Sequence, residues 1–285
     1  MSAPAGTLWF ESPTGPLRVE GAAELMPALR AQAPDWPGGE DGPADAPLIR
    51  VDTAADGSIR FFSEVYDTPG FVFAPGLFAG NGLIGCLISS FCARSPDWIC
   101  LHAGAVEIGG RLTVLVGDMM AGKSTLSVAL AALGRRLWCD DRLPVEGAGP
   151  FDGFSLALRP KLREPLPPNA PAAFRRFAGD RPGAREGEMR YVALRSDERA
   201  PFGARLPVGR IVLLSRRDGA ETALAPAPLG EAVKRLVPTA FAPHLAPLDR
   251  LARLRALAEN AEVLELAYAD SFEAAALLDS REAGA

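Results

Sequence analysis

Several residue types are scarce in this chain of 285 residues, and each scarcity excludes a class of function. Only two histidines occur, His102 and His244, so metal chemistry based on imidazole is nearly excluded. The four cysteines form no C-x-x-C pair, which disfavours a zinc site and favours reduced core thiols in a cytoplasm. The formal net charge is −5 and the pI about 5.3, so no overall basic field is present to hold nucleic acid.

Long hydrophobic runs are also missing. The most apolar window, residues 82–92, is too short to span a bilayer and fits a buried helix. The first ten residues lack the basic stretch and the long apolar run of a secretory signal. We therefore expect a cytoplasmic globular protein without a membrane or nucleic-acid partner, and its length allows one large domain or two smaller ones.

The most informative segment that is present fits the Walker A pattern G-x-x-x-x-G-K-[ST]. It consists of Gly117, Asp118, Met119, Met120, Ala121, Gly122, Lys123, Ser124 and Thr125. An apolar run at 112–116, predicted to be a buried strand, precedes it, and a helical pattern over 124–133 follows. Loop amides and the helix dipole favour a phosphate at such a helix start, so the segment predicts nucleotide binding.

Within this loop, Lys123 would reach the β- and γ-phosphates of ATP, and the Ser124 hydroxyl would ligate Mg²⁺. The alternative, a glycine turn before an ordinary helix, leaves the lysine and its two neighbouring hydroxyls unexplained. Met119 and Met120 are bulky where phosphate loops usually carry small residues. An altered or weakened nucleotide site is therefore a second interpretation.

Asp140 and Asp141 end a short apolar strand that follows the loop and its helix. In a βαβ arrangement this strand returns to the sheet edge where the loop lies, so the carboxylates would face the phosphates. One carboxylate could hold Mg²⁺ while the other accepts a proton from an attacking hydroxyl. The alternative is a pair of aspartates in a surface turn.

Basic residues offer further phosphate or acidic-substrate contacts. Arg159, Lys161 and Arg163 alternate with apolar or neutral residues and would share one face of an extended segment, either as a clamp or as a charged edge strand. Five arginines occupy residues 165–190, and one of them could stabilise transition-state charge if that stretch closes over the site: Arg175, Arg176, Arg181, Arg185 and Arg190.

The pattern of elements predicts an α/β fold with two parts. Residues 1–97 form a small, mostly β region closed by a helix over 81–93, and residues 98–285 form the α/β part. The predicted strands of the second part cover 99–108, 112–116, 136–139, 208–214 and 263–268, and its later helices cover 229–237, 248–259 and 271–279. Residues 165–188 carry few large apolar side chains and are predicted to be a mobile loop. Ser271 is predicted to cap the last helix.

Three segments together resemble the catalytic core of the HPr serine kinase family: Leu-His-Ala-Gly-Ala-Val-Glu at 101–107, the loop at 117–124, and Arg-Arg-Leu-Trp-Cys-Asp-Asp at 135–141. The resemblance implies a P-loop core like the C-terminal domain of those enzymes, and ATP- and Mg²⁺-dependent transfer to a serine. It also implies that Asp140 is the base, that Asp141 and Ser124 lie by Mg²⁺, and that His102 sits near the transferring phosphate.

The acceptor implied by the resemblance is a peptide or small protein. Thr125 replaces the glutamate that follows the loop serine in enzymes acting on HPr, which favours the shorter relatives that phosphorylate ribosomally made peptides such as lasso precursors. Three alternative functions remain: a non-catalytic nucleotide-binding partner of a peptide-modifying system, an HPr kinase/phosphorylase, and a small-molecule kinase. The assembly could be a homo-oligomer.

Overall fold

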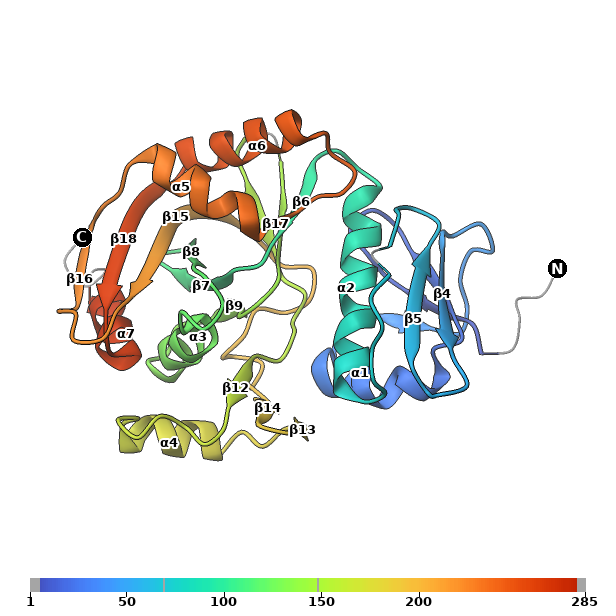
Figure 1. Ribbon diagram of the computed structural model, residues 1–285, viewed down its shortest axis with the longest axis horizontal. Helices are drawn as coiled ribbons and strands as arrows, with labels where there is room; N and C mark the ends of the chain where they lie inside the picture. Colours follow the sequence, from blue (N-terminus) through green and yellow to red (C-terminus); the bar gives the residue numbers. More distant parts are fainter. Residues whose placement is uncertain (1–5, 69, 148, 281–285) are drawn as a thin grey trace.

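The computed structural model describes residues 6–68, 70–147 and 149–280. Figure 1 shows a small N-terminal body beside a larger one, with one long helix, α2 (Leu77–Ala93), between them. The predicted α/β class is confirmed, since sheets and helices alternate through the larger body. Within the described residues, no helix is both long and apolar enough to cross a membrane.

The N-terminal body is a five-stranded sheet in the order β3-β1-β2-β4-β5. Its strands are β1 (Leu8–Phe10), β2 (Leu17–Glu20), β3 (Gly38–Gly39), β4 (Leu48–Thr53) and β5 (Ile59–Ser63). A 3-10 turn, η1 (Ala23–Leu25), leads into α1 (Met26–Gln32), a helix that the sequence pattern did not predict. Strands thus make up most of the regular structure of this body.

Helix α2 packs its apolar residues against this sheet. The predicted helix over 81–93 is confirmed and begins four residues earlier. Glycine allows the close packing, because a Cβ at Gly82 would lie 2.7 Å from the ring of Phe61. The same hydrophobic cluster includes Trp98 and Phe154 of the larger body, so one core runs across both bodies. The division at residue 97 stays a prediction.

The larger sheet has ten strands, with β15 near its centre. Its path is β17-β6-β10-β11-β15-β8-β7-β9, and β18 pairs with β15 and β16. The strands are β6 (Trp98–Leu101), β7 (Gly104–Ile108), β8 (Arg111–Val116), β9 (Leu137–Cys139), β10 (Leu143–Glu146), β11 (Asp152–Phe154), β15 (Arg205–Arg216), β16 (Ala223–Pro226), β17 (Ala240–Phe241) and β18 (Glu262–Tyr268). Strands β8, β15 and β18 run parallel to one another.

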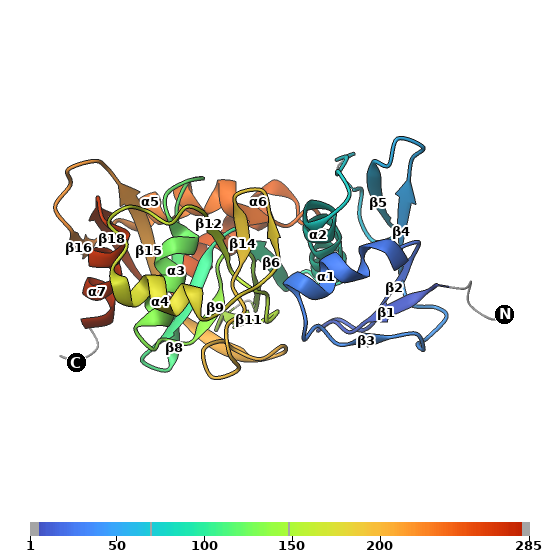
Figure 2. The ribbon, with the colours of Figure 1, turned by 90° about the horizontal axis from the view of Figure 1, so that it is seen from below.

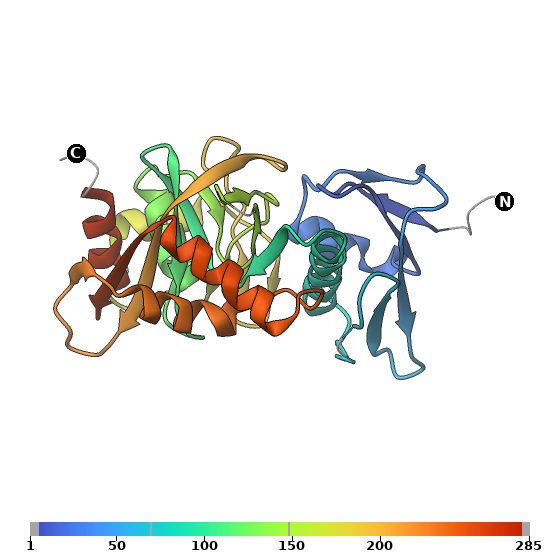
Figure 3. The ribbon, with the colours of Figure 1, turned by 90° about the horizontal axis from the view of Figure 1, so that it is seen from above.

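Helices cover both faces of this sheet. They are α3 (Lys123–Ala132), α5 (Leu229–Leu236), α6 (Pro247–Glu259) and α7 (Ser271–Ser280), with a 3-10 turn η2 (Val237–Thr239) after α5. Along β15, Ile211 and Leu213 belong to the core with α5 and α6, whereas Val212 and Leu214 belong to the core with α3 and α7. This alternation is the period of two of a strand buried on both faces. Figures 2 and 3 show the opposite helical faces.

The predicted mobile loop over 165–188 is wrong. This stretch contains α4 (Ala172–Gly179) and part of a small sheet made of β12 (Lys161–Arg163), β13 (Arg185–Glu186) and β14 (Met189–Tyr191). Two apolar residues one turn apart, Phe174 and Ala178, are buried, and Phe174 packs on Phe272 with ring centroids 4.9 Å apart. A short helix with a small apolar face needs this tertiary contact to form, which composition alone does not reveal.

The cap of the last helix also differs from the prediction. Ser271 is the first residue of α7, and the side chain of Asp270 accepts the backbone N–H of Phe272 at 2.6 Å. Asp270 therefore satisfies the free amide at this helix start, as an N-cap residue does. The four cysteines are free and buried, as expected for reduced core thiols.

Candidate functional site

Strand direction brings the predicted site residues to one edge of the sheet. Strand β7 runs antiparallel to both β8 and β9. The carboxyl ends of β8 and β9 and the amino end of β7 therefore lie at the same edge. The phosphate loop follows β8, Asp140 and Asp141 follow β9, and His102 precedes β7. The predicted convergence arises although β7 separates the two parallel strands.

The loop itself has the backbone shape that its glycines permit. Gly122, the residue before α3, is left-handed with a φ of 93°, and a Cβ at Gly117 would lie 3.0 Å from the Cβ of Leu214. Met120 is also left-handed, with a φ of 68°. Met119 and Met120 are 83% and 64% exposed, and both border the open space beside the loop. The predicted departure from small residues therefore places two bulky side chains at this space and one non-glycine residue in a strained conformation.

Side chains from the far end of the chain hold this loop. The Tyr268 hydroxyl, at the end of β18, donates to the carbonyl of Ala121. A Cβ at Gly122 would lie 3.1 Å from the Ser271 hydroxyl. Burial raises the pKa of Tyr268 to about 12, so the phenol keeps the proton that it donates. The periodicity of the strand gave no signal for this contact.

Lys123 is buried at the start of α3, with 8% of its surface exposed. Its Nζ atom donates to the carbonyls of Gly117 at 2.7 Å and Asp118 at 3.1 Å. Burial lowers the pKa of Lys123. The ammonium therefore lies inside the loop, and a phosphate there would exchange for these neutral acceptors. Thr125 is half-buried in the first turn of α3.

Asp140 is buried and lies on the loop side of the aspartate pair. Its Oδ2 accepts the backbone N–H of Lys161 at 2.9 Å. The neighbouring Ser124 hydroxyl is among the groups that lower the pKa of this carboxylate. Burial raises the pKa of Asp140, against the opposing charge of Lys161. A hydroxyl and a carboxylate held together are oxygen donors of the kind that Mg²⁺ takes from proteins beside substrate phosphates. These two residues therefore fit the predicted ion.

Asp141 faces the other way, toward His102. Its Oδ1 lies 2.7 Å from Nε2 of His102, and its Oδ2 lies 2.7 Å from Nζ of Lys161 and 3.9 Å from Nε of Arg142. Burial alone would raise the pKa of Asp141, but the hydrogen bonds from His102 and Lys161 and the charges of Lys161 and Arg142 together hold it below its ordinary value. Among the described residues, no group of three or more His, Cys, Asp or Glu side chains could hold a metal ion. Ser124 acts on the carboxylate of Asp140. The family resemblance instead implies that Ser124 and Asp141 lie together at the metal.

Two of the three basic residues at 159–163 lie near the aspartates. Lys161 reaches Asp141, and Arg159, which donates to the carbonyl of Ala31, lines a small pocket with both aspartates, whereas Arg163 is exposed. Arg142 belongs to none of the sequence motifs, and it borders Asp141 because it directly follows that residue in the chain.

Three of the five arginines at 175–190 support the small sheet and its surroundings. Arg181 pairs with Glu198, and Arg185 and Arg190 both pair with Glu164. None of the five lines either of the two hollows beside the site. Their partners, distant along the chain, could not be read from the sequence.

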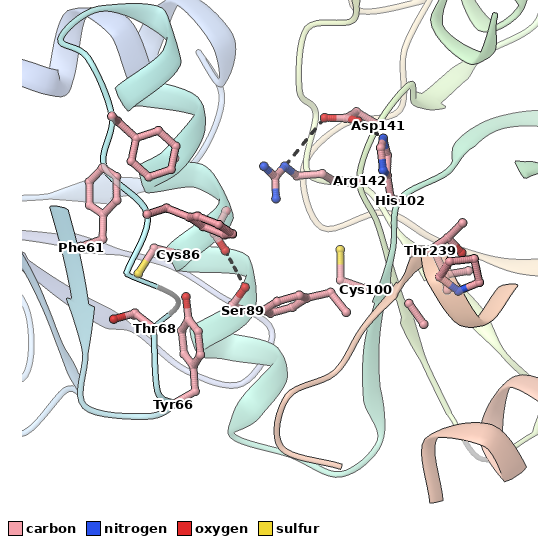
Figure 4. Close-up of a pocket in the computed structure, with 18 of the residues that line it drawn as sticks. Phe61, Tyr66, Thr68, Cys86, Ser89, Cys100, His102, Asp141, Arg142 and Thr239 are labelled. Carbon is pink, nitrogen blue, oxygen red and sulfur yellow. Dashed lines mark hydrogen bonds and ion pairs between the residues drawn. The ribbon is translucent and has the colours of Figure 1, made fainter. Parts of the chain in front are cut away.

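Two hollows flank the loop and the aspartates. One, of about 810 Å³, lies beside the loop. It is lined by four cationic side chains, Arg216, Arg217, Lys234 and Arg235, which outnumber the three acidic ones, Asp118, Asp218 and Glu231. The other, of about 560 Å³, lies between α2 and the aspartates and is mostly apolar; Figure 4 shows Asp141, Arg142 and His102 at its edge. The excess of cationic side chains in the first hollow suits a polyphosphate. The second hollow suits an apolar molecule or side chain.

No family model and no curated protein matches the chain significantly. Among solved structures, the chain is similar to the HPr(Ser) kinase/phosphatase from Coxiella burnetii, with 13% identity and a TM-score of 0.31 over 64% of this chain and 91% of that one. At this identity and TM-score, the likeness assigns neither a family nor an activity.

Proposed function

We propose that this protein is an ATP- and Mg²⁺-dependent phosphotransferase that acts on the serine hydroxyl of a peptide or small protein. The observation that carries the proposal is the meeting of a phosphate loop, its buried Lys123 and two aspartates at one sheet edge, between a cationic and an apolar hollow. A ribosomally made precursor peptide, of the lasso type that the sequence resemblance implies, is the substrate we propose first.

The proposed nucleotide and ion ligands lie on one side of the aspartate pair, and the proposed acceptor site lies on the other. Lys123, the loop amides and the cations of the open hollow bind the polyphosphate. Ser124 and Asp140 would hold Mg²⁺, which supplies charge neutralisation on the phosphate oxygens. On the other side, Asp141 and His102 border the apolar hollow from which an acceptor would approach.

In the proposed reaction the acceptor oxygen attacks the γ-phosphorus of ATP. A bond forms between these two atoms, the bond from phosphorus to the β–γ bridging oxygen breaks, and ADP leaves. The hydroxyl proton passes to the carboxylate of Asp141, which His102 and Lys161 orient. Geometry takes precedence over pKa in choosing a base. Asp141 lines the apolar hollow and Asp140 does not, so we propose Asp141 as the base and Asp140 as the ligand of the ion, the reverse of the roles implied by the resemblance.

Single-turnover transfer from labelled ATP to serine peptides tests the proposal and the two roles. Asp141→Asn should lower the rate of transfer at least about 100-fold while nucleotide affinity stays unchanged. Asp140→Asn should instead weaken Mg²⁺-dependent nucleotide binding. Asp140 is the base if transfer survives in Asp141→Asn but disappears in Asp140→Asn while the Mg²⁺ dependence of nucleotide binding stays unchanged.

A second candidate function is a nucleotide-binding partner without catalysis. It is favoured by Lys123, whose ammonium hydrogen-bonds to loop carbonyls, and by the left-handed Met120. Calorimetry separates the two functions, because ATP or ADP binding without transfer to any serine peptide supports the non-catalytic partner. Absence of nucleotide binding would remove both.

A further inference from the structure

The apolar hollow is built by both bodies of the protein. The N-terminal body and α2 contribute Phe61, Tyr66 and Cys86 to one wall, while β6 and β17 contribute Cys100 and Phe241 to the other. Figure 4 shows Phe61, Tyr66 and Cys86 on the α2 side and Cys100 opposite them. Tyr66 and Phe241 meet edge to face with ring centroids 6.2 Å apart, so aromatic rings join the two walls.

Glycine on α2 keeps the space beside the aspartates open. A Cβ at Gly85 would lie 2.9 Å from Nη1 of Arg142, so any other residue there would push the guanidinium away. The Nε atom of Arg142 is buried and lies 3.9 Å from Oδ2 of Asp141, an ion-pair distance, but within the part of the chain that the structure describes it makes no hydrogen bond. A buried donor without a partner costs free energy, and an acceptor on a bound molecule would remove that cost.

The hollow is continuous with the proposed transfer site, because His102, Asp141 and Arg142 line it together with the aromatic residues. A hydroxyl placed at Asp141 would therefore have the apolar walls directly beside it. We infer that the hollow binds a bulky apolar side chain next to the acceptor serine, with a backbone carbonyl of the same peptide at Arg142. This inference rests on the proposed function and names the class of peptide: a serine flanked by aromatic or large aliphatic residues.

Peptide binding without nucleotide tests this inference separately from catalysis. The probes are the dye-labelled peptides Ala-Phe-Ser-Phe-Ala and Ala-Gly-Ser-Gly-Ala, measured by fluorescence anisotropy with the full chain. Burying one phenylalanine side chain should make the first peptide bind at least about tenfold more tightly. Phe241→Ala removes one wall of the hollow, and Ala240→Trp fills its space. Both substitutions should bring the ratio of the two peptides' Kd values toward one.

Leu248→Ala is the matched control, because Leu248 is 79% exposed on α6 and does not line the hollow. It should leave the ratio unchanged, and circular dichroism should show all variants folded. Equal binding of the two peptides, no binding of either, or a ratio that persists in both variants of the hollow overturns the inference. A ratio that depends on the hollow, without phosphoryl transfer from ATP, supports the inference and overturns the proposed function.

Discussion

The Nε2 atom of His102 lies 2.7 Å from Oδ1 of Asp141, although a strand hairpin, a loop, a helix and a further strand separate them in the chain. The contact forms because β7 begins at the sheet edge where β9 ends. It helps to hold the pKa of Asp141 below its ordinary value. His102 is thus a positioning residue for the proposed base.

Removing this contact should change the pH dependence of transfer. In His102→Ala the pKa of Asp141 should rise, because one of the donors that lower it is lost. The acid limb of the kcat/KM profile should then move to higher pH, and kcat should fall. His102→Gln, whose amide can still donate, should move the limb less, and His244→Ala should leave it in place. An unmoved limb in His102→Ala would contradict the assignment.

The two neighbouring aspartates should affect stability with opposite sign. The pKa of Asp141 is lowered, so its carboxylate stabilises the folded protein above 3.8, the ordinary value, and this contribution is lost as pH falls through the folded pKa. Asp141→Asn should therefore lower the free energy of unfolding at pH 7 by roughly 1–3 kcal/mol, with a difference that shrinks in acid.

Asp140→Asn should instead stabilise the protein. Burial raises the pKa of Asp140, so its ionised form costs stability above the folded pKa and costs nothing below 3.8. Neutralising such a functional carboxylate should add roughly 0.5–2 kcal/mol at neutral pH, and the gain should vanish in acid. Urea unfolding of both variants across pH measures this, and two changes of the same sign at pH 7 would contradict the electrostatic assignment.

Lys123→Ala should weaken nucleotide binding. A buried ammonium that contacts phosphate contributes about 1.5–3 kcal/mol, so the Kd for ATP should rise at least about tenfold. Arg60→Ala is the control, because Arg60 is an exposed cation on β5 that does not line the cationic hollow. Calorimetry should find a change below about threefold for the control. Equal effects of the two substitutions would undo the assignment of the loop.

Met120→Gly should stabilise the loop relative to Met119→Gly. Both changes add the same chain entropy to the unfolded state, but only Met120 has a left-handed φ of 68°. Relief of that strain should make the Met120 variant about 1 kcal/mol more stable than the Met119 variant, with tighter nucleotide binding. Chemical unfolding of the two variants provides the measurement. Equal stabilities would mean that the strain at Met120 is absent in solution.

Local patterns in the sequence determined much of the larger body. The strand before the loop, the helix after it and the strands around Val212 and Leu264 follow from apolar runs bounded by turn residues, because burial and period are encoded locally. Helix α4 was missed because its apolar face consists of little more than Phe174 and Ala178, and Phe272 completes its packing. The phosphate loop and the aspartate pair of the candidate site could likewise be named from spacing, whereas His102 could be named only from the family resemblance.

Only the tertiary structure decided which neighbours each residue of the candidate site has. The sequence placed Asp140 and Asp141 together, but the backbone turns one carboxylate toward Ser124 and the other toward His102. The sequence also gave no sign that Tyr268 holds the loop or that Phe241 faces α2. These contacts join segments far apart in the chain, and their geometry depends on sheet order and helix packing, which no local pattern specifies.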